Sequence, residues 1–561
     1  MEKIIKNNSK VIIFIAVAFT LLSSAFIINQ SVNILWADEW DTPGNLLIKE
    51  INNPKDLGIN DFFSQHNESR KFFPKLIYYA AFNMGIFDTR IGVLIRLILS
   101  ATTIYLLYNL SKSKCSLHNS YILLFSCLLV FIPTQAYNQI FGLQFITAVP
   151  SFCIILNIFL NKYLNNKFLI IFFTAILCIV STFSYSNGII IWVICNPFIL
   201  HFLKITRFKK WHLLVFNLLF LVSVILYFVD YKHPAQHPGF QEGLSEPIRA
   251  LKYFTLWFFS PFLIGLSHPV FVSLVLTTIY FGYFFFILSK TIRVFLQSKK
   301  LCWSTLCALF LIIYSSASCT IASLGRSGFG YMAALGPQYP SFALWAHLGI
   351  LVLTFSRSIN LNQQTKNMVI CFYSILYLFS LEIGFSSFQN WSQKMKQAKL
   401  TVENLDICPN NSLITEFHPS SSSVKSKIES FASVGIIEFQ NNQWIKSLQK
   451  KDALFPGESG WVTISQSQNS INFNGWASIP VSKKPADYVL IGVHYKDQFV
   501  PLTFVLPHLK RTDVQNALKV KGHSNYGFNK TIKMPKHLSK LTPYCYSVNE
   551  ADNKYYKISE I

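Results

Sequence analysis

The chain has 561 residues, of which 52% are hydrophobic and only 13% are charged. A soluble protein carries about a quarter charged residues, so this composition excludes an ordinary soluble enzyme and predicts an integral membrane protein with a polar part attached. The formal net charge is +23, but many basic residues lie in short loops between apolar runs instead of on one domain. This distribution predicts membrane topology and argues against nucleic-acid binding.

The first apolar run, Val11–Asn29, follows a basic segment. It is long for a signal peptide and no clear cleavage site follows it, so we predict a first transmembrane helix with a cytoplasmic N-terminus. The segment Leu251–Leu266 is interrupted by Pro261, and we interpret it as a re-entrant or interfacial helix. Other runs predict spans, several of them shorter than the roughly 20 residues that cross a bilayer: Ile91–Leu110, Ser120–Ile132, Phe145–Leu160, Phe168–Phe183, Gly188–Leu203, Leu213–Val229, Val270–Leu288, Cys302–Ala322, Phe342–Phe355 and Met368–Phe385.

The charges in the connecting loops test this assignment. With the N-terminus inside, the inner loops carry Lys and Arg without any Asp or Glu, and the acidic residues fall in the outer segments. This is the positive-inside bias of membrane proteins. It predicts an α-helical polytopic membrane domain of about eleven spans over residues 1–386, with a first extracytoplasmic loop at about residues 30–90. Everything after Phe385 then lies outside the cytoplasm.

The C-terminal part is a different kind of sequence. Residues 387–460 are polar and predict a partly helical linker, whereas residues 461–561 alternate short β-branched and aromatic runs with turn signals. This spacing predicts a small β-rich, sandwich-like domain. A glycan-binding domain and a structural cap both fit it, and whether Cys408 pairs with Cys545 stays open. The runs are Ser470–Ile479, Tyr488–Tyr495, Phe499–Val505, Gly527–Met534 and Tyr544–Val548.

Three carboxylates, Asp38, Glu39 and Asp41, follow the first span. Unpaired carboxylates cost several kcal/mol in hydrocarbon, so we expect this cluster in the wet interface, with Trp36 and Trp40 in an aromatic belt. One interpretation is a polar loop start with anchoring tryptophans. The other is an acid/base or metal-binding site at the mouth of a membrane-embedded site, in which Asp38 and Asp41 would hold a divalent ion such as Mg²⁺ or Mn²⁺.

The same outer loop contains a second polar group, formed by His66, Asn67, Glu68 and Arg70. Long loops without regular structure are usually functional or disordered. Imidazole serves as a general acid/base or metal ligand, and guanidinium pairs bidentately with phosphate, so this group is a candidate substrate-binding site. A solvated helix start with local ion pairs explains the same residues.

Further candidates for substrate binding lie in other outer loops and in one span. Arg326 sits among glycines in residues 325–330, before Tyr339; glycine permits close approach to a ligand and arginine suits an anion. Asn187 belongs to an Asn-Gly turn, which needs no function. Arg96 lies inside the second span, where a charge is a functional hypothesis by default and snorkelling is the alternative. An outer-face site suits a substrate whose lipid stays in the bilayer.

These features resemble the GT-C superfamily of multispan glycosyltransferases, which use polyprenyl-phosphate-linked sugars. The resemblance rests on Asp38-Glu39 at the start of a long loop after the first span, and on many spans followed by an extracytoplasmic C-terminal domain. The stretches Gln65–Glu68 and Gly325–Ser327 are also similar to those of bacterial members. The resemblance covers residues 1–386 and does not extend to the C-terminal domain.

The resemblance implies roles for several residues. Asp38, with Glu39 and Asp41 behind it, would act as general base on an acceptor hydroxyl or hold a divalent metal. Arg326 and Arg96 would hold the lipid phosphate. The family pattern leads us to expect a basic residue before Tyr339, where this chain has Gln338.

Glycosyl transfer from a phosphate donor needs a base for the nucleophile and positive charge on the leaving phosphate. The sequence therefore predicts a glycosyltransferase of the bacterial plasma membrane. It would move a hexose or pentose from a polyprenyl-phosphate carrier to a cell-surface glycan, lipid or protein acceptor on the outer face. The alternatives are a transporter or flippase of lipid-linked oligosaccharide, which needs polar or broken helices near the midplane, and a polymerase or ligase of surface polysaccharide. A structural scaffold would not explain why acid, His and Arg collect on one face.

Overall fold

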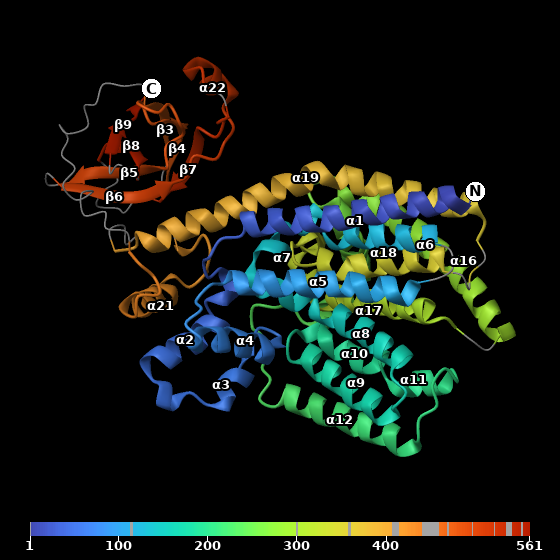
Figure 1. The fold of residues 1–561 in the computed structure, drawn as a ribbon. Helices are drawn as coiled ribbons and strands as arrows, with labels where there is room; N and C mark the ends of the chain where they lie inside the picture. Colours follow the sequence, from blue (N-terminus) through green and yellow to red (C-terminus); the bar gives the residue numbers. More distant parts are fainter. Residues whose placement is uncertain are drawn as a thin grey trace. The chain divides into compact units, whose positions relative to one another are not determined.

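A computed structural model of the protein describes residues 2–112, 116–266, 268–298, 301–356, 359, 361–406, 414–439, 459–467, 470–495, 498–520, 522–533, 541–550 and 554–560. The chain divides into two compact units, residues 1–31 with 58–391, and residues 32–57 with 392–561. The first unit is mainly helical and the second contains the large β-sheets (Figure 1). The predicted loop at residues 30–90 is thus shared between the two units, a division that hydropathy alone does not reveal.

The first unit is built from long apolar helices. Among the described residues, eight helical segments are long and apolar enough to cross a membrane, and three shorter apolar ones accompany them. Every predicted run corresponds to one of these segments, which confirms the predicted polytopic helical fold. The helices are α1 (Glu2–Gln30), α5 (Arg90–Ser111), α6 (Ser116–Val130), α8 (Val149–Tyr163), α9 (Lys167–Thr182), α10 (Ile191–Ile194), α11 (Pro197–Phe202), α12 (Lys210–Phe228), α16 (Pro269–Ser298), α17 (Trp303–Arg326), α18 (Pro340–Phe355) and α19 (Gln363–Glu403).

Short elements connect these helices. In the first unit they are α3 (Ile59–Phe63), α4 (Phe72–Asn83), α7 (Ala136–Ile140), α13 (Phe240–Ser245), α14 (Pro247–Phe258), α15 (Ser260–Leu263) and the 3₁₀ turns η3 (Pro133–Gln135), η4 (Gly142–Thr147), η5 (Ser186–Ile190), η6 (Ser327–Phe329) and η7 (Tyr331–Leu335). The second unit contains η1 (Ala37–Glu39), α2 (Pro43–Asn52) and η2 (Pro54–Asp56). The interrupted segment Leu251–Leu266 folds as α14 and α15, which are both too short to span a bilayer.

The predicted span Gly188–Leu203 is not one continuous helix. It breaks between α10 and α11, because Pro197 has no amide hydrogen and the Asn196 side chain caps α11 by accepting from the Phe198 amide at 3.0 Å. The Asn196 amide also donates to the Asn217 side chain at 3.1 Å.

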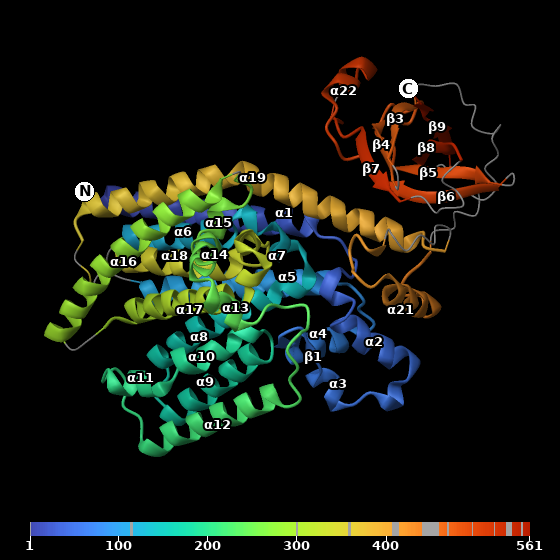
Figure 2. The ribbon, with the colours of Figure 1, turned by 180° about the vertical axis from the view of Figure 1, so that it is seen from behind.

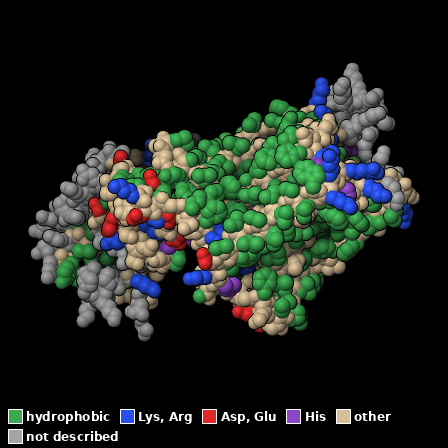
Figure 3. Space-filling model, turned by 90° about the horizontal axis from the view of Figure 1, so that it is seen from below, with side chains coloured by type: hydrophobic (Ala, Val, Ile, Leu, Met, Phe, Trp, Pro, Cys, Tyr) green, Lys and Arg blue, Asp and Glu red, His purple; other side chains and the backbone are tan. Residues whose placement is uncertain are grey.

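The outward surface of the helical unit is apolar. Phe14 on α1 and Phe271 on α16 are 73% and 74% exposed, and apolar side chains cover a broad face in Figure 3. Apolar patches of this extent are rare on soluble monomers and suit contact with lipid. Helices α1 and α19 lie side by side in both ribbon views (Figure 2), and the Phe26 ring packs against the Phe388 ring with 5.1 Å between centroids.

Helix packing explains the Asn-Gly turn. A Cβ added to Gly188 would lie 2.0 Å from the Ser181 carbonyl oxygen, so the chain approaches too closely there for any side chain. We expect Gly188→Ala to lower the free energy of unfolding by about 2–3 kcal/mol, the usual cost of overpacking. Gly282→Ala on α16 is the matched control. Nothing lies within 4 Å of its added Cβ, so the melting temperature should be unchanged or slightly higher. Equal melting temperatures of the two variants would contradict this packing argument.

The C-terminal part of the second unit is a β-sandwich of two four-stranded sheets, ordered β10-β3-β4-β7 and β6-β5-β8-β9. All pairs are antiparallel except β10 with β3. This confirms the predicted β-rich, sandwich-like domain. The strands are β3 (Gly460–Gln466), β4 (Ile471–Ala477), β5 (Tyr488–Tyr495), β6 (Gln498–Val505), β7 (Gly527–Ile532), β8 (Pro543–Asn549), β9 (Lys554–Lys557) and β10 (Ser559–Glu560), with helices α21 (Ser421–Ser433) and α22 (Thr512–Leu518) in the same unit.

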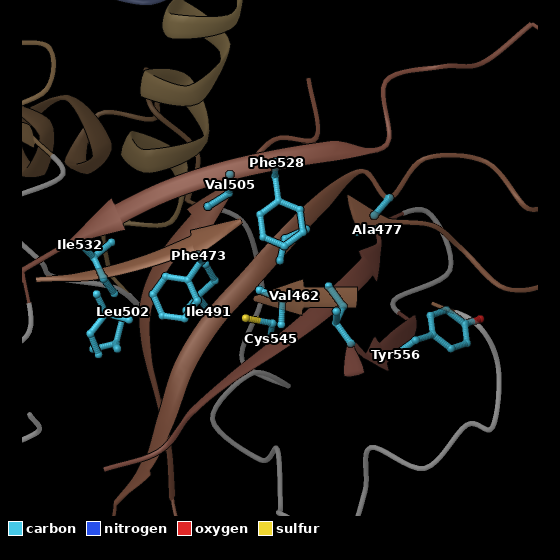
Figure 4. Close-up of a cluster of buried hydrophobic side chains, with 14 of the residues drawn as sticks. Val462, Phe473, Ala477, Ile491, Leu502, Val505, Phe528, Ile532, Cys545 and Tyr556 are labelled. Carbon is cyan, nitrogen blue, oxygen red and sulfur yellow. The ribbon is translucent and has the colours of Figure 1, made fainter. Parts of the chain in front are cut away.

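The sandwich core contains inward side chains from both sheets (Figure 4), including Phe473 and Phe528 from one sheet and Ile491 and Leu502 from the other. Cys545 packs in this core, and Cys408 lies outside the described residues. On the outer face of β6-β5-β8-β9, Leu400 from the end of α19 joins a second apolar cluster. That sheet is therefore buried on both sides, as the almost fully buried strand β5 requires.

Candidate functional site

The acidic stretch after the first span folds with the C-terminal segment 414–433 inside the second unit. The Ala37 amide donates to the Phe417 carbonyl at 3.2 Å, and the rings of Trp36 and Trp40 lie 6.2 and 6.3 Å from that of Phe417. Both tryptophans are buried, and Trp40 is 0% exposed. The predicted aromatic belt at the headgroups is therefore wrong: these rings form part of a protein core.

Glu39 and Asp41 contact residues that hold this stretch in place. Glu39 is 1% exposed and its Oε2 accepts from the Trp36 amide at 3.0 Å, which caps η1. Asp41 accepts from Lys427 Nζ at 3.1 Å and lies 3.0 Å from His418 Nε2. Lys427 also donates to the Trp40 carbonyl at 2.8 Å. Asp38 lies half-buried in η1, directly before Glu39.

Asp41 gives a pH prediction. Burial raises its pKa, but hydrogen bonds from His418 and Lys427 outweigh this and lower it to about 2. A depressed carboxyl pKa stabilises the fold above the unfolded value of 3.8, and this contribution is lost as pH falls through about 2. Asp41→Asn should therefore lower the free energy of local opening of residues 37–52 at pH 7 by about 1–2 kcal/mol, after allowance for solvent screening. Hydrogen exchange in these residues should become faster accordingly. The difference between wild type and variant should shrink below pH 4; a difference that does not depend on pH would contradict it.

The donor set of this stretch does not fit a divalent metal. Within the described part of the chain, no group of three or more His, Cys, Asp or Glu side chains could hold a metal ion. The Lys427 ammonium, 3.1 Å from Asp41, would also repel a divalent cation. The expected Mg²⁺ or Mn²⁺ site at Asp38 and Asp41 therefore finds no support in these residues, and we derive no metal-dependent step.

The second polar group forms a small hairpin in the first unit. Strands β1 (Gln65–His66) and β2 (Ser69–Arg70) are joined by Asn67 and Glu68, and Asn67 has the left-handed φ of 49° that asparagine tolerates. His66 Nε2 lies 3.2 Å from the Asn67 side-chain nitrogen. Arg70 donates to the carbonyls of Phe63 (2.6 Å), Tyr227 (2.7 Å) and Val229, which ties the hairpin to the end of α12. This guanidinium serves the fold.

Glu68, at the tip of the hairpin, bridges Arg326 and His237, which come from distant parts of the first unit. Its Oε2 accepts from Arg326 Nη2 at 2.7 Å, and its Oε1 contacts His237 Nδ1. All three side chains retain some exposure, 26% for Glu68, 30% for Arg326 and 12% for His237. Sequence reasoning missed His237, because it lies 169 residues from Glu68, in the loop before α13 and without a recognisable motif.

Three tyrosines lie near Arg326. Tyr185, Tyr253 and Tyr339 lie close enough to interact with it electrostatically, and the Tyr253 hydroxyl donates to the Tyr339 hydroxyl at 2.9 Å. Burial and the Glu68 charge raise the pKa of Tyr231, which faces the same cluster. The structure thus brings together the predicted residues Glu68, Arg326 and Tyr339, which form with His237 what we call the arginine cluster. Asn187, half-buried in η5, lies two residues after Tyr185.

Glycines near Arg326 serve packing. A Cβ on Gly328 would come within 2.3 Å of Glu242 Oε2 and 2.4 Å of Pro238 Cβ, so η6 lies directly against the 238–242 segment. This close approach of η6 holds the end of α17, and thereby Arg326, beside the loop that carries His237.

Arg96 lies within the helical bundle and does not reach the surface. It is 5% exposed and donates to Gln144 O (2.9 Å), Thr147 Oγ1 (2.8 Å), Gln135 Oε1 (3.1 Å) and Ser341 Oγ (2.9 Å). Snorkelling is therefore excluded. Ser341 lies two residues after Tyr339, so Arg96 fixes the start of α18. Asn138 fixes the preceding turn, since its amide donates to the Pro337 and Gln338 carbonyls at 2.8 and 3.3 Å.

Comparison with known proteins gives little beyond this geometry. No protein-family model matches the chain, and no curated protein sequence matches it. A similar solved structure is the archaeal oligosaccharyltransferase AglB from Archaeoglobus fulgidus, in complex with an inhibitory peptide and a dolichol-phosphate. The identity is 13%, the match covers 69% of this chain and 58% of AglB, and the TM-score is 0.32. A similarity at this level identifies neither a family nor an activity.

Proposed function

We propose that this chain is a GT-C-like membrane glycosyltransferase. It moves a sugar from a polyprenyl-phosphate carrier to a cell-surface glycan, lipid or protein acceptor on the outer face of the bacterial plasma membrane. The observation that carries the proposal is Arg326, held by Glu68 at the end of the membrane-long helix α17, with three tyrosines nearby. A guanidinium fixed at the end of a span suits the phosphate of a lipid whose chain stays in the bilayer.

The reaction forms one bond to the anomeric carbon of the sugar and breaks another. The acceptor hydroxyl oxygen bonds to the anomeric carbon of the sugar, and the bond from that carbon to the phosphate oxygen breaks. The electron pair stays on the released polyprenyl phosphate, where Arg326 stabilises the charge. The hydroxyl proton moves to a carboxylate base.

We propose Asp38 as this base on the strength of the resemblance described above. Glu39 is buried and caps η1, and a pKa of about 2 makes Asp41 a weak proton acceptor. Glu68 already bridges Arg326 and His237, which makes it a positioning residue for the guanidinium. Asp38 opens the Asp38-Glu39 pair that resembles the GT-C pattern, and it lies half-buried in its 3₁₀ turn.

Transport of lipid-linked oligosaccharide is a second candidate. The break between α10 and α11 and the buried polar network around Arg96 are features that a transporter would use.

Asp38→Asn tests the transferase. Purified protein in lipid is mixed with radiolabelled polyprenyl-phosphate sugars and a cell-envelope acceptor extract. Wild type should label the acceptor, and the variant should do so about 100-fold or more slowly while staying in the membrane, because a general base typically contributes that much. Wild-type activity in Asp38→Asn would assign the base to another carboxylate. Failure of wild type to consume any donor would contradict the proposed activity.

A further inference from the structure

The two sheets of the sandwich differ in what covers their outer faces. The end of α19 packs on β6-β5-β8-β9, where the Gln397 side chain also donates to the Phe504 carbonyl at 2.6 Å and accepts from the Leu506 amide at 3.1 Å. On β10-β3-β4-β7 the outward side chains of the described strands are mostly exposed, and Trp461 is 51% exposed. The sheet therefore presents a surface that needs an explanation.

Strand register arranges the outward side chains in rows. Since side chains alternate between faces along each strand, partners in register share a face. The first row is Trp461, Trp476 and Gly527, the second is Thr463, Asn474 and Asn529, and the third is Ser465, Asn472 and Thr531. Ser559 on β10 lies next to Trp461. None of these positions is charged, although the chain as a whole has a formal net charge of +23.

We propose that this surface, which we call the tryptophan–amide face (Trp461, Thr463, Asn474, Trp476 and Asn529), binds an uncharged glycan chain. A pyranose ring has an apolar C–H face that stacks on an exposed indole, and a rim of hydroxyls that both donate and accept hydrogen bonds. Asparagine and threonine side chains also do both. The rows provide them about 4.8 Å apart from strand to strand, close to the size of one sugar unit.

The hydrogen-bonding groups of the second row are available to a ligand. Thr463, Asn474 and Asn529 form no side-chain hydrogen bond within the described part of the chain; in the third row Thr531 donates to Asn472 Oδ1 at 3.1 Å. An anionic polymer would find no cation in these outward rows, since Lys530 of β7 lies in the row of Phe473 and pairs with Glu416. A lipid surface would leave the amides unpaired at a cost. A neutral glycan satisfies both the indole and the amides.

The face is rigid and has a defined border. Trp476 packs on the small cluster of Val514, Leu518 and Tyr526, and it pairs with Trp461 in the strand register. At the far end of the first row, Gly527 has no side chain, and an added Cβ would meet Leu509 Cβ at 2.9 Å and Arg511 Cγ at 3.0 Å. Arg511 is paired with Asp513 at 2.6 Å, so this border does not present an unpaired cation.

The test uses the full-length protein in detergent, without any polyprenyl-phosphate donor, so its result is independent of the proposed transferase activity. Tryptophan fluorescence and calorimetry follow titration with neutral hexasaccharides of glucose, mannose and N-acetylglucosamine, and with hexagalacturonate as the anionic probe. We expect wild type to bind at least one neutral hexasaccharide in preference to the anionic one. Trp461→Ala should weaken that binding at least 10-fold, Asn474→Ala should weaken it less, and Trp461→Tyr should retain it.

Val481→Ala is the control, since Val481 is an 84% exposed apolar residue outside these strands and its removal should leave binding unchanged. Circular dichroism and thermal melts verify that every variant is folded. The proposal is overturned if wild type binds none of the neutral probes, if hexagalacturonate binds better, or if a folded Trp461→Ala binds as wild type does.

Discussion

Arg326→Gln is expected to lower kcat/KM for the polyprenyl-phosphate donor by about 100- to 1,000-fold, the range found when one preorganised donor to a developing charge is removed. The reason is geometric: Glu68 fixes one edge of the guanidinium at 2.7 Å, so the remaining N–H groups are aimed before the donor arrives. Initial rates with labelled donor measure the effect. Arg326→Lys keeps the charge but not the planar fork, and should recover only part of the lost rate.

Arg90→Gln is the matched control for Arg326. Arg90 also pairs with a carboxylate in the first unit, Asp88 at 2.5 Å, but its side chain is 46% exposed and belongs to no proposed site. Because exposed ion pairs contribute little, its rate should stay within about twofold of wild type. A comparable loss in both variants would show that Arg326 acts only through general stability.

Lys427→Met is expected to loosen the segment that carries Asp38. Lys427 is buried and joins the Asp41 carboxylate to the Trp40 carbonyl, so its removal leaves two acceptors without that donor. Breaking a buried pair from one side costs roughly 3–5 kcal/mol, and the partial exposure of Asp41 reduces this to about 2–3 kcal/mol. Hydrogen exchange in residues 37–52 should speed accordingly, and sugar transfer should fall about 10- to 100-fold as Asp38 loses its fixed position.

Lys399→Met controls for loss of a lysine in the same unit. Lys399 pairs with Glu403 at 3.6 Å across one helical turn, and its side chain is 44% exposed, so neither exchange nor transfer should change. If Lys427→Met shows faster hydrogen exchange but transfers sugar at the wild-type rate, the Asp41–Lys427 ion pair does not support the function of Asp38. The double variant with Asp41→Asn should be less than additive, since both changes remove one interaction.

Much of the fold is predictable from the sequence because its signals are local. Hydropathy over about 20 residues identifies spans, and β-branched runs between turn residues identify strands. The strand Tyr488–Tyr495 has the predicted bounds, whereas the run Gly188–Leu203 breaks at Asn196 and Pro197, where capping chemistry overrides hydropathy.

The partners of the candidate site residues are a different matter. His418 lies 377 residues from Asp41, and His237 lies 169 residues from Glu68. No spacing in a single sequence connects such residues, since the contacts arise only when tertiary structure forms. For the same reason, sequence reasoning treated residues 30–90 as one loop, while residues 32–57 fold with the C-terminal unit. By residue type, Glu68, Arg70 and Arg96 are equally good candidates for substrate binding. Their partners distinguish them: Glu68 pairs with the partly exposed Arg326, whereas Arg70 and Arg96 donate to groups that hold the fold together.

The most direct test of the account measures two products at once in proteoliposomes that contain wild-type protein and a doubly labelled polyprenyl-phosphate sugar. One label reports polyprenyl phosphate released from the sugar, and leaflet-specific quenching of the other reports lipid movement. The account predicts one polyprenyl phosphate released for each sugar joined to the acceptor. Intact donor that moves between leaflets without release would contradict it and favour the transporter.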